Sequence, residues 1–436
     1  MRYHSTRDPA HSATLSEAIS RGLAPDGGLY VPESFPSFSD ADFAGADTLP
    51  EVAARLLAPF FAGDALAPAL GEICREAFDF PVPLKELRGS TAVLELFHGP
   101  TAAFKDVGAR FLAGCLSRIA AEDARPLTLL VATSGDTGGA VAAAFHGRPG
   151  VEVAVLFPAG MVSPRQEKQL TSWGGNVRAF AVRGDFDACQ RLVKGAMADP
   201  ELRARRRLSS ANSINVGRLL PQMAYYAWAS LEYRALHGVA PGFVVPSGNL
   251  GNAAAAMWAC RCGLPVREVV LATNANPAVT AFFGGAPWTP HPTLATLATA
   301  MDVGSASNME RLLHLFGGEA GTRSALRAFL VDDDEIRRVI RDGPASWGEI
   351  WDPHTAVAIA VLERLDAPHW IVVSTAHPAK FEAVVEPLIG RPVSVPPDLA
   401  RLLDRPGHAE PLDPELEVFK ATLELPPVHG AARHGR

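Results

Sequence analysis

The sequence predicts an α/β protein with doubly wound parallel sheets and a mostly helical N-terminal domain. Short segments at 127–133, 151–157, 243–246, 268–273 and 370–375 are apolar at nearly every position. Strands of this kind are buried on both faces, which is typical of a parallel sheet covered by helices. Glycine-rich turns and helical patterns follow these strands repeatedly, and this favours a doubly wound arrangement.

The length of the chain, 436 residues, exceeds what one hydrophobic core supports, so we expect two or three domains. Residues 1–88 alternate short helical patterns with Pro and Gly breaks and show little strand. That pattern predicts a separate, mostly helical N-terminal domain. We place a smaller α/β domain at 89–215 and a larger one at 216–436.

Charge and hydropathy argue against two classes of partner. A formal net charge of −7 gives no reason to expect nucleic acid or an acidic membrane surface as a partner. No segment approaches the ~18 uninterrupted apolar residues of a membrane span. The N-terminus is charged and polar, where a signal peptide would be apolar. We expect no nucleic-acid and no membrane partner.

Cysteine usage indicates a reducing compartment. The five cysteines are too few and too scattered for a disulfide framework. Cys260 and Cys262 lack the two-residue gap of a zinc knuckle, and no other Cys or His pair completes four ligands, so no metal site is expected. We therefore expect a cytoplasmic protein.

Lys105 lies between a Gly-Pro turn and the expected start of a helix. Apolar residues recur at helical spacing after it, which places Asp106 at or near the N-cap and Lys105 just outside the helix. An ammonium is disfavoured at the positive end of the helix dipole. A desolvated, neutral lysine is a Schiff-base former, and the alternative is a surface lysine that reaches solvent beside a cap.

Two glycine-rich stretches, 132–145 and 245–258, each read as strand, turn and helix. Glycine lets the backbone approach a ligand, and free N–H groups at a helix start bind anions. Neither stretch matches a phosphate loop or a dinucleotide fingerprint, and each alone is explained equally well as a plain turn. Taken with Lys105, they favour a ligand with phosphate, carboxylate and aldehyde groups, and pyridoxal phosphate bearing an amino acid fits.

Further motifs occur in order along the chain: "GLAPDGGLYVP", "ELFHGPTAAFKD", "TSGDTGGAV", "VSPRQEKQLTSWGGNV", "ANSINVGRLLPQ", "PSGNLGN", "TNANP", "MDVGSASNMERL", "DPHTAV" and "STAHPAKF". The stretch around Lys105 resembles the pyridoxal-phosphate attachment site of the threonine synthase family, and the resemblance extends over nearly the full length. It is similar to the longer branch of that family, which has an extra N-terminal domain. The resemblance implies a fold-type-II pyridoxal-phosphate enzyme.

The resemblance also implies how the cofactor is held. Lys105 would form the Schiff base with pyridoxal phosphate and shuttle protons. Thr375 would hydrogen-bond to the pyridine nitrogen, and Asp136 would lie near the ring. The cofactor phosphate would be cradled by the backbone of Ser247, Gly248, Asn249, Leu250, Gly251 and Asn252.

The implied substrate is O-phospho-L-homoserine, which would react with water to give L-threonine and phosphate. The residues that would receive its carboxylate are Ser134, Gly135, Asp136, Thr137 and Gly138. The residues that would hold its phosphate are Asn212, Ser213 and Arg218. The 89–215 domain would thus carry Lys105 and the carboxylate loop, and the 216–436 domain the cofactor phosphate loop. His354 and His377 fall in matching motifs and are interpreted as structural support.

Two alternatives remain at this point. One is another fold-type-II reaction, such as threonine or serine dehydration or a β-replacement, whose substrates do not need a phosphate-binding cation. The other is a non-catalytic relative that binds a phosphorylated amino acid. For the enzyme we expect a monomer or a homodimer.

Overall fold

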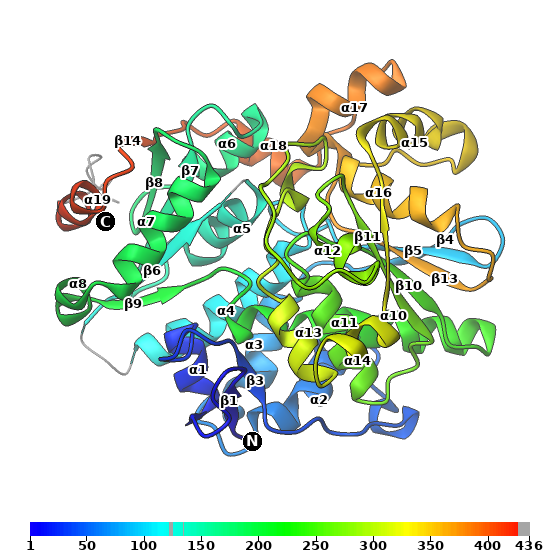
Figure 1. Ribbon diagram of the computed structural model, residues 1–436, viewed down its shortest axis with the longest axis horizontal. Coiled ribbons are helices and arrows are strands. Elements are labelled where there is room, and N and C mark those ends of the chain that lie inside the picture. The colour runs from blue at the N-terminus through cyan, green and yellow to red at the C-terminus, as the bar shows by residue number, and fades with distance from the viewer. Residues whose placement is uncertain (122–124, 134, 426–436) are drawn as a thin grey trace, which may run out of the picture.

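The computed structural model describes residues 1–121, 125–133 and 135–425. Two large sheets lie side by side, on the left and on the right in Figure 1, and the N-terminal segment lies below them. Helix α4 (Lys105–Ala120) packs against helices of the N-terminal segment and also against the helix that follows β6.

The left-hand sheet, which we call the β7 sheet, has the strand order β14-β8-β7-β6-β9 with parallel pairing throughout. Its strands are β6 (Leu127–Ala132), β7 (Val151–Pro158), β8 (Val177–Val182), β9 (Arg207–Ser210) and β14 (Glu410–Leu412). The helices of this region are α5 (Asp136–Phe145), α6 (Pro164–Thr171), α7 (Phe186–Ala198), α8 (Pro200–Arg205), α18 (Pro397–Leu403) and α19 (Leu416–Glu424). Along β6, Leu129 and Val131 enter the core that contains α5, whereas Leu130 and Ala132 enter the core that contains α7. Helices therefore cover both faces.

The right-hand sheet, which we call the β10 sheet, has the order β12-β11-β10-β13-β5-β4. Its strands are β4 (Leu84–Glu86), β5 (Thr91–Glu95), β10 (Gly242–Pro246), β11 (Glu268–Thr273), β12 (Arg327–Leu330) and β13 (Trp370–Ser374). The pairs are parallel except β4 with β5, which is antiparallel. The helices and 3₁₀ turns of this region are α9 (Val216–Leu219), α10 (Gln222–His237), α11 (Gly251–Arg261), α12 (Ala278–Phe283), η4 (Thr299–Met301), α13 (Met309–Leu315), α14 (Glu319–Ala325), α15 (Asp333–Ser346), α16 (Pro353–Leu362), η5 (Pro378–Phe381) and α17 (Glu382–Ile389).

The predicted fold class is confirmed. Each apolar segment expected to be a strand is one, and each pairs in parallel with its neighbours. These segments form buried parallel strands because a strand covered on both faces needs apolar side chains on both. Among the described residues, no helix is both long and apolar enough to span a membrane.

The strands do not follow the expected division at residue 215. Strand β5, from the 89–215 range, pairs with β13 in the β10 sheet. Strand β14, from the 216–436 range, pairs with β8 in the β7 sheet. The chain therefore crosses between the sheets more than once.

The N-terminal segment contains helices and short strands. They are β1 (Tyr3–Ser5), β2 (Ser12–Ala13), α1 (Leu15–Arg21), β3 (Tyr30–Pro32), η1 (Asp40–Phe43), α2 (Leu49–Leu57), η2 (Ala58–Phe61), η3 (Ala67–Ala69) and α3 (Leu70–Ala77). Helix α3 packs against α4, and α2 packs against α10. The apolar side chains of this segment belong to the same hydrophobic cluster as α4, α5 and α11. The segment thus supports the outer side of the helix that begins at Lys105.

The start of α4 differs from the prediction. Lys105 is the first residue of the helix, and Phe104 already has helical backbone angles, with φ −56° and ψ −20°. Asp106 faces backward instead of capping the helix, because its carboxylate accepts hydrogen bonds from the backbone N–H and the hydroxyl of Thr101. The expectation that Lys105 lies outside the helix is therefore wrong.

Candidate active site

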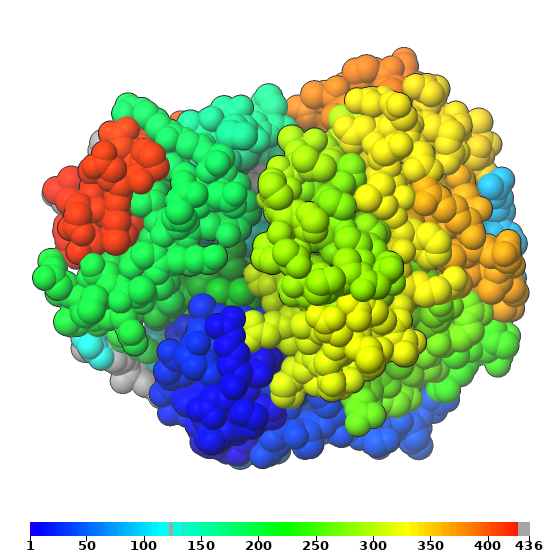
Figure 2. All heavy atoms as spheres, viewed as in Figure 1, coloured from blue at the N-terminus to red at the C-terminus, as the bar shows by residue number. Residues whose placement is uncertain are grey.

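A cavity of about 220 Å³ opens between the two sheets. Strands β6, β9, β10 and β13 end beside it, which is where parallel α/β sheets bind ligands. The surface is hollowed between the left-hand and central parts of the molecule in Figure 2. Most of the expected residues line this cavity, namely Lys105, Asp136, Thr137, Asn212, Ser213, Arg218, Ser247, Gly248, Asn249, Leu250, Gly251, Asn252 and Thr375.

Two expected residues do not line the described part of the cavity, and a third cannot be placed. Gly135 and Gly138 do not belong to the part of the cavity wall formed by described residues. Ser134 lies outside the described residues.

Lys105 lies in the cavity with its Nζ 4.9 Å from the centre of the Phe104 ring. Burial lowers the pKa of Lys105 to about 8, and the nearby cations Lys380 and Arg218 act in the same direction. The carboxylate of Asp136 opposes this shift. A substantial fraction of the amine is thus neutral near physiological pH, as nucleophilic and proton-transfer chemistry requires.

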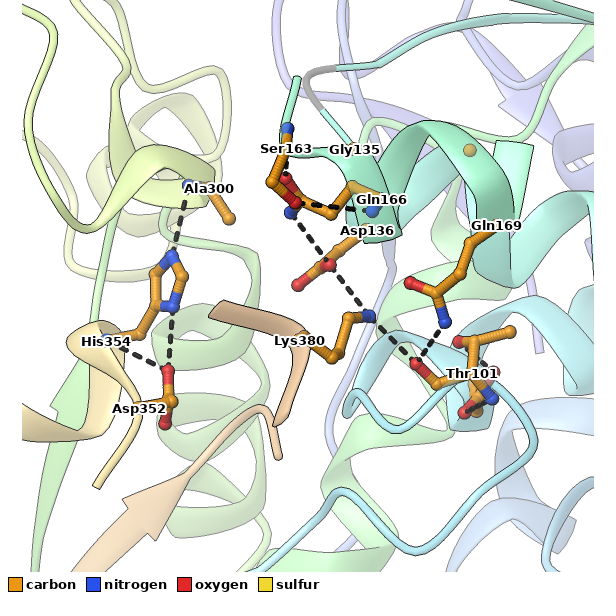
Figure 3. A network of polar contacts seen from close by, with 12 residues as sticks. Thr101, Gly135, Asp136, Ser163, Gln166, Gln169, Ala300, Asp352, His354 and Lys380 are labelled. Carbon is orange, nitrogen blue, oxygen red and sulfur yellow. Dashed lines mark hydrogen bonds and ion pairs between the residues drawn. The ribbon is translucent and has the colours of Figure 1, made fainter. Parts of the chain in front are cut away.

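Asp136, the first residue of α5, forms a buried ion pair with Lys380 (Figure 3). The distance from Lys380 Nζ to Asp136 Oδ1 is 2.8 Å, and both side chains are almost fully buried. Burial by itself raises the pKa of Asp136, but Lys380 and Lys105 together hold that pKa well below its ordinary value. Asp136 is therefore an anion, fixed beside the amine of Lys105.

Two further contacts fix this ion pair (Figure 3). Gln166, from α6, donates from Nε2 to Asp136 Oδ1 at 3.2 Å. Lys380 Nζ also donates to the backbone oxygen of Thr101 at 2.8 Å, and Gln169 Nε2 donates to the same oxygen at 2.9 Å. The pair is thus tied to the turn that precedes Lys105.

In the loop between β6 and α5, some of the backbone N–H groups that could bind an anion are already hydrogen-bonded within the loop. The hydroxyl of Thr133 accepts hydrogen bonds from the N–H groups of Gly135, at 3.0 Å, and Gly138, at 2.9 Å. Gly135 has a φ of 138°, a conformation that only glycine adopts easily. Two of the backbone donors expected to receive a carboxylate are therefore already occupied.

The loop between β10 and α11 is arranged in the opposite way. Leu250 takes the left-handed conformation, with a φ of 57°, just before the helix begins at Gly251. Within the described chain, no side chain caps this helix. A Cβ on Gly248 would lie 2.7 Å from Met301 Cα, so this position has room only for glycine. The N–H groups of the first turn are left for a ligand.

Asn252 adds a side-chain donor to this loop. Its Oδ1 accepts hydrogen bonds from the hydroxyls of Tyr225, at 2.5 Å, and Tyr226, at 2.8 Å. Its buried Nδ2 has no hydrogen-bond partner among the described residues. Because these bonds orient the amide, Nδ2 is a fixed donor beside the cavity, and such a donor is costly to leave unpaired.

Asn249 joins this loop to the Asn212–Ser213 loop. Asn249 Nδ2 donates to Ser213 Oγ at 2.6 Å, and Asn308 Nδ2 lies 3.3 Å from the same oxygen. On the other side, Asn212 Nδ2 donates to the backbone oxygen of Ala132, at the end of β6. The two expected phosphate loops are therefore adjacent, and Asn212 connects them to the β7 sheet.

Arg218 is a buried cation with an incomplete set of partners. Its Nη1 donates to the backbone oxygen of Ala211, whereas its Nε has no partner in the described part of the chain. A Cβ on Gly108 of α4 would lie 2.8 Å from that Nε, so glycine there leaves space for the guanidinium. Burial lowers the pKa of Arg218 to about 10, opposed by Asp106. The cation remains charged at neutral pH and is suited to receive an anion.

Arg311 is a second buried arginine, and it has a different role. Its nitrogens donate to the backbone oxygens of Tyr30, Ser213 and Ile214, and to Asn308 Oδ1. It thus binds strand β3 of the N-terminal segment to the Ser213 loop. Since its donors are used in this way, Arg311 is a structural residue.

His354 supports the far wall of the cavity, as expected from sequence (Figure 3). Its Nδ1 lies 2.8 Å from Asp352 Oδ1, and its Nε2 accepts a hydrogen bond from the N–H of Ala300 at 3.1 Å.

Asp302 lines the same part of the cavity. Its carboxylate accepts hydrogen bonds from Thr296 and Asn274. Burial raises the pKa of Asp302 to about 6, against the effect of the Thr296 hydrogen bonds.

Sequence reasoning missed Lys380, Gln166 and Thr133. Lys380 and Gln166 lie in the motifs "STAHPAKF" and "VSPRQEKQLTSWGGNV", so their presence in matching segments was the available signal. Lys380 lies more than two hundred positions from Asp136 along the chain. Gln166 lies about thirty positions from it. No local pattern predicts such pairing.

The residues of the cavity fit pyridoxal phosphate. Asn252 Nδ2 and the uncapped start of α11 provide donors for a phosphate, and Leu250 keeps the loop in a strained conformation that exposes them. Lys105 provides an amine of lowered pKa in the same cavity. Thr375, at the end of β13, lines the cavity with a neutral hydroxyl.

Comparison with known proteins agrees with this geometry. The family described as "Pyridoxal-phosphate dependent enzyme" matches residues 81–375. The families "Threonine synthase N terminus" and "Threonine synthase, C-terminal" match residues 2–78 and 355–423. The chain belongs to the threonine synthase family. Pyridoxal phosphate is the cofactor of this family of enzymes.

Relatives within the family cover nearly the whole chain. Threonine synthase of Escherichia coli strain K12 is 40% identical over 95% of this chain and 97% of its own length. Threonine synthase of Serratia marcescens is 39% identical over 98% of this chain and 100% of its own. The crystal structure of the Escherichia coli threonine synthase covers 97% of this chain and 99% of its own, with a TM-score of 0.90 and 38% identity. The structure of threonine synthase with bound pyridoxal phosphate from Brucella melitensis has a TM-score of 0.90 and 35% identity, covering 97% and 98%.

Proposed function

We propose that the cavity around Lys105 is the active site of a threonine synthase that converts O-phospho-L-homoserine and water to L-threonine and phosphate. One observation carries the choice of substrate. Arg218, a buried cation whose guanidinium has a nitrogen without a partner among the described residues, lines the same cavity as an amine of lowered pKa. A substrate with both an amino acid end and a phosphate end satisfies both groups.

Three parts of the cavity would hold the cofactor. The N–H groups at the start of α11 and Asn252 Nδ2 would bind its phosphate, and Thr375 would hydrogen-bond to its ring nitrogen. Lys105 would be the point of covalent attachment. When bound, pyridoxal phosphate supplies an electron sink that makes the protons on the substrate Cα and then Cβ acidic.

Lys105 moves the protons. Its neutral amine would take the proton from the substrate Cα and then a proton from Cβ, and the phosphate would leave Cγ. Protons then return to Cγ and Cα, and water adds to Cβ. A pKa of about 8 suits an amine that must both accept and release protons near neutral pH.

Asp136 and Lys380 act on Lys105 by position and charge. The ion pair fixes an anion beside the amine and a second cation close to that anion. Burial is the main cause of the lowered pKa of Lys105; Asp136 raises that pKa and Lys380 lowers it, so the two charges of the pair act on it in opposite directions. We assign both as positioning residues.

The substrate is oriented by its two anionic ends. Arg218, Asn212 and Ser213 hold its phosphate, and the first turn of α5 holds its carboxylate. Because Thr133 occupies the N–H groups of Gly135 and Gly138, the carboxylate is received by the remaining donors of that turn, including Thr137.

Steady-state kinetics of Arg218 variants test the proposal. Arg218→Ala should lower kcat/KM for O-phospho-L-homoserine by about ten- to 150-fold, the effect of losing a charge-assisted hydrogen bond of about 1.5 to 3 kcal/mol. Arg218→Lys should recover part of it, since an ammonium restores charge but not the planar fork. Cofactor binding, followed by absorbance, should be unchanged in both.

The matched control uses alternative substrates that lack a phosphate group. Serine and threonine lack a phosphate, so their deamination should be slow and insensitive to Arg218. An Arg218→Ala enzyme within twofold of wild type would refute the phosphate assignment. Turnover of serine or threonine as fast as O-phospho-L-homoserine would favour a dehydratase.

We also propose a cytoplasmic enzyme that is a monomer or a homodimer. The cysteines are all free, and most are buried, as in proteins of reducing compartments. Analytical ultracentrifugation at several concentrations distinguishes the two assembly states.

A further inference from the structure

Helix α7 forms one wall of the cavity with a face that the reaction scheme leaves unused. Phe186, Gln190, Val193 and Lys194 line the cavity, at the spacing of one helix face. The neighbouring face of the helix, with Cys189 and Leu192, is buried in the core against the β7 sheet. The helix is therefore fixed by packing, and its cavity-facing residues are held in place.

Lys194 is the cation of this face. It is exposed to solvent although it lines the cavity, so it lies at the mouth and not in the interior. No acidic side chain among the described residues pairs with it. Most other lysines of the chain are engaged: Lys85 with Glu349, Lys380 with Asp136, and Lys420 with Asp199.

The charge of the whole molecule gives a cation at the mouth of the cavity a role in substrate approach. The formal net charge of the chain is −7, so an anionic substrate is repelled on average as it approaches. Inside the cavity, Arg218 is buried and can act on the substrate only after it has entered. A cation at the mouth acts earlier, because Coulomb attraction at an exposed site reaches about 10 Å at 0.1 M ionic strength.

We infer that Lys194 captures the phosphate group of the substrate at the mouth of the cavity and passes it to Arg218. This inference rests on the proposed function, since it takes the substrate to be a phosphate ester. Lys194 is then a substrate-binding residue for the encounter. It takes no part in the proton transfers, so its removal should alter kcat/KM and leave kcat unchanged.

The experiment compares three variants of the holoenzyme with wild type. Lys194→Gln removes the charge at the mouth, and Lys194→Arg retains it. Arg203→Gln, on α8, removes one positive charge from an exposed position of the same region that does not line the cavity. Phosphate release is measured at several ionic strengths, and inorganic phosphate is titrated as a competitive inhibitor.

Lys194→Gln should lower kcat/KM by about three- to tenfold at low ionic strength, and raise the inhibition constant of inorganic phosphate by a similar factor. The difference from wild type should shrink as salt is added. Lys194→Arg should match wild type within twofold, and Arg203→Gln should as well.

Three results would overturn the inference while leaving the proposed function intact. They are equal changes in Lys194→Gln and Arg203→Gln, a loss confined to kcat, and a salt dependence that Lys194→Gln does not alter. A wild-type enzyme that releases no phosphate from O-phospho-L-homoserine would overturn the proposed function, and the inference with it.

Discussion

The loop after β6 and the loop after β10 have the same local design but opposite electrostatic states. Both run from an apolar strand through a glycine-rich turn into a helix that starts at the cavity. In the first, the hydroxyl of Thr133 takes two backbone donors and the helix begins with the buried anion Asp136. In the second, the helix start is uncapped within the described residues, and Asn252 presents an unpaired donor.

The difference shows how a single motif serves two purposes. A helix start that already holds an anion, and whose N–H groups are partly bound by a neighbouring hydroxyl, is what we call the filled site; here it positions charge beside Lys105 and leaves only its remaining donors for the substrate carboxylate. A helix start with free donors is an open site for a ligand phosphate. The side chains that decide between the two come from other parts of the chain. Four predictions test this comparison.

The largest effect is expected from breaking the filled site. Lys380→Met leaves Asp136 as a buried anion without its main partner, and removal of one member of a buried pair costs about 3 to 5 kcal/mol. We expect the free energy of unfolding to fall by about that amount in urea denaturation of the cofactor-free protein.

The double variant Lys380→Met with Asp136→Asn is the control for this prediction. It removes the stranded charge, so it should be more stable than Lys380→Met alone. If the single variant is as stable as wild type, Lys380 does not compensate Asp136.

The open site should fail when it is given an anion of its own. Asn252→Asp keeps the acceptor for Tyr225 and Tyr226 but replaces the free donor with a negative charge. Losing a hydrogen bond to a charged group, about 1.5 to 3 kcal/mol, corresponds to a fall of about ten- to 150-fold in affinity for pyridoxal phosphate. Titration of the cofactor-free protein by absorbance measures it. Unchanged affinity would place the cofactor phosphate elsewhere.

Freeing the donors of the filled site should reduce stability without creating a second phosphate site. Thr133→Val keeps the side-chain shape but leaves the N–H groups of Gly135 and Gly138 without their acceptor. A buried donor left unpaired costs about 1 to 3 kcal/mol, and we expect a loss of about 2 kcal/mol in unfolding free energy. Affinity for pyridoxal phosphate should change less than in Asn252→Asp, and a larger change would mean that the two loops share the cofactor phosphate.

The smallest effect is the pH dependence of Lys105. Its pKa of about 8 lies below the ordinary lysine value of 10.5, so the amine is protonated below about pH 8 and neutral above it. Only the neutral amine attacks an aldehyde. Covalent uptake of pyridoxal phosphate by the cofactor-free protein should therefore rise about tenfold per pH unit below the midpoint and level off above it. Stopped-flow absorbance checks this, with Lys105→Ala as the unreactive control. A midpoint near 10 would contradict the lowered pKa.

Much of the architecture could be predicted from local pattern. The strands β6, β7, β10, β11 and β13 were predictable because burial on both faces leaves an apolar run, and Lys105 because of its position at a helix start. The short strand β14 was not, since an edge position needs no apolar run. Sequence pattern also placed Lys105 just outside α4, because it could not show that Thr101 draws the Asp106 carboxylate away from the helix end.

The sequence by itself determined the class of fold, the two glycine-rich helix starts, the candidate amine and, through its ordered motifs, the resemblance to a family. Only the tertiary structure decided which helix start is filled and which is open, and that Lys380 neutralises Asp136. It also decided that, among the described residues, Arg218 keeps a nitrogen without a partner where Arg311 does not. The physical reason is the distance along the chain over which each interaction acts. Hydrogen-bonding periodicity acts within a few residues, whereas burial and charge compensation depend on groups that become neighbours only when the sheets and their helices pack together.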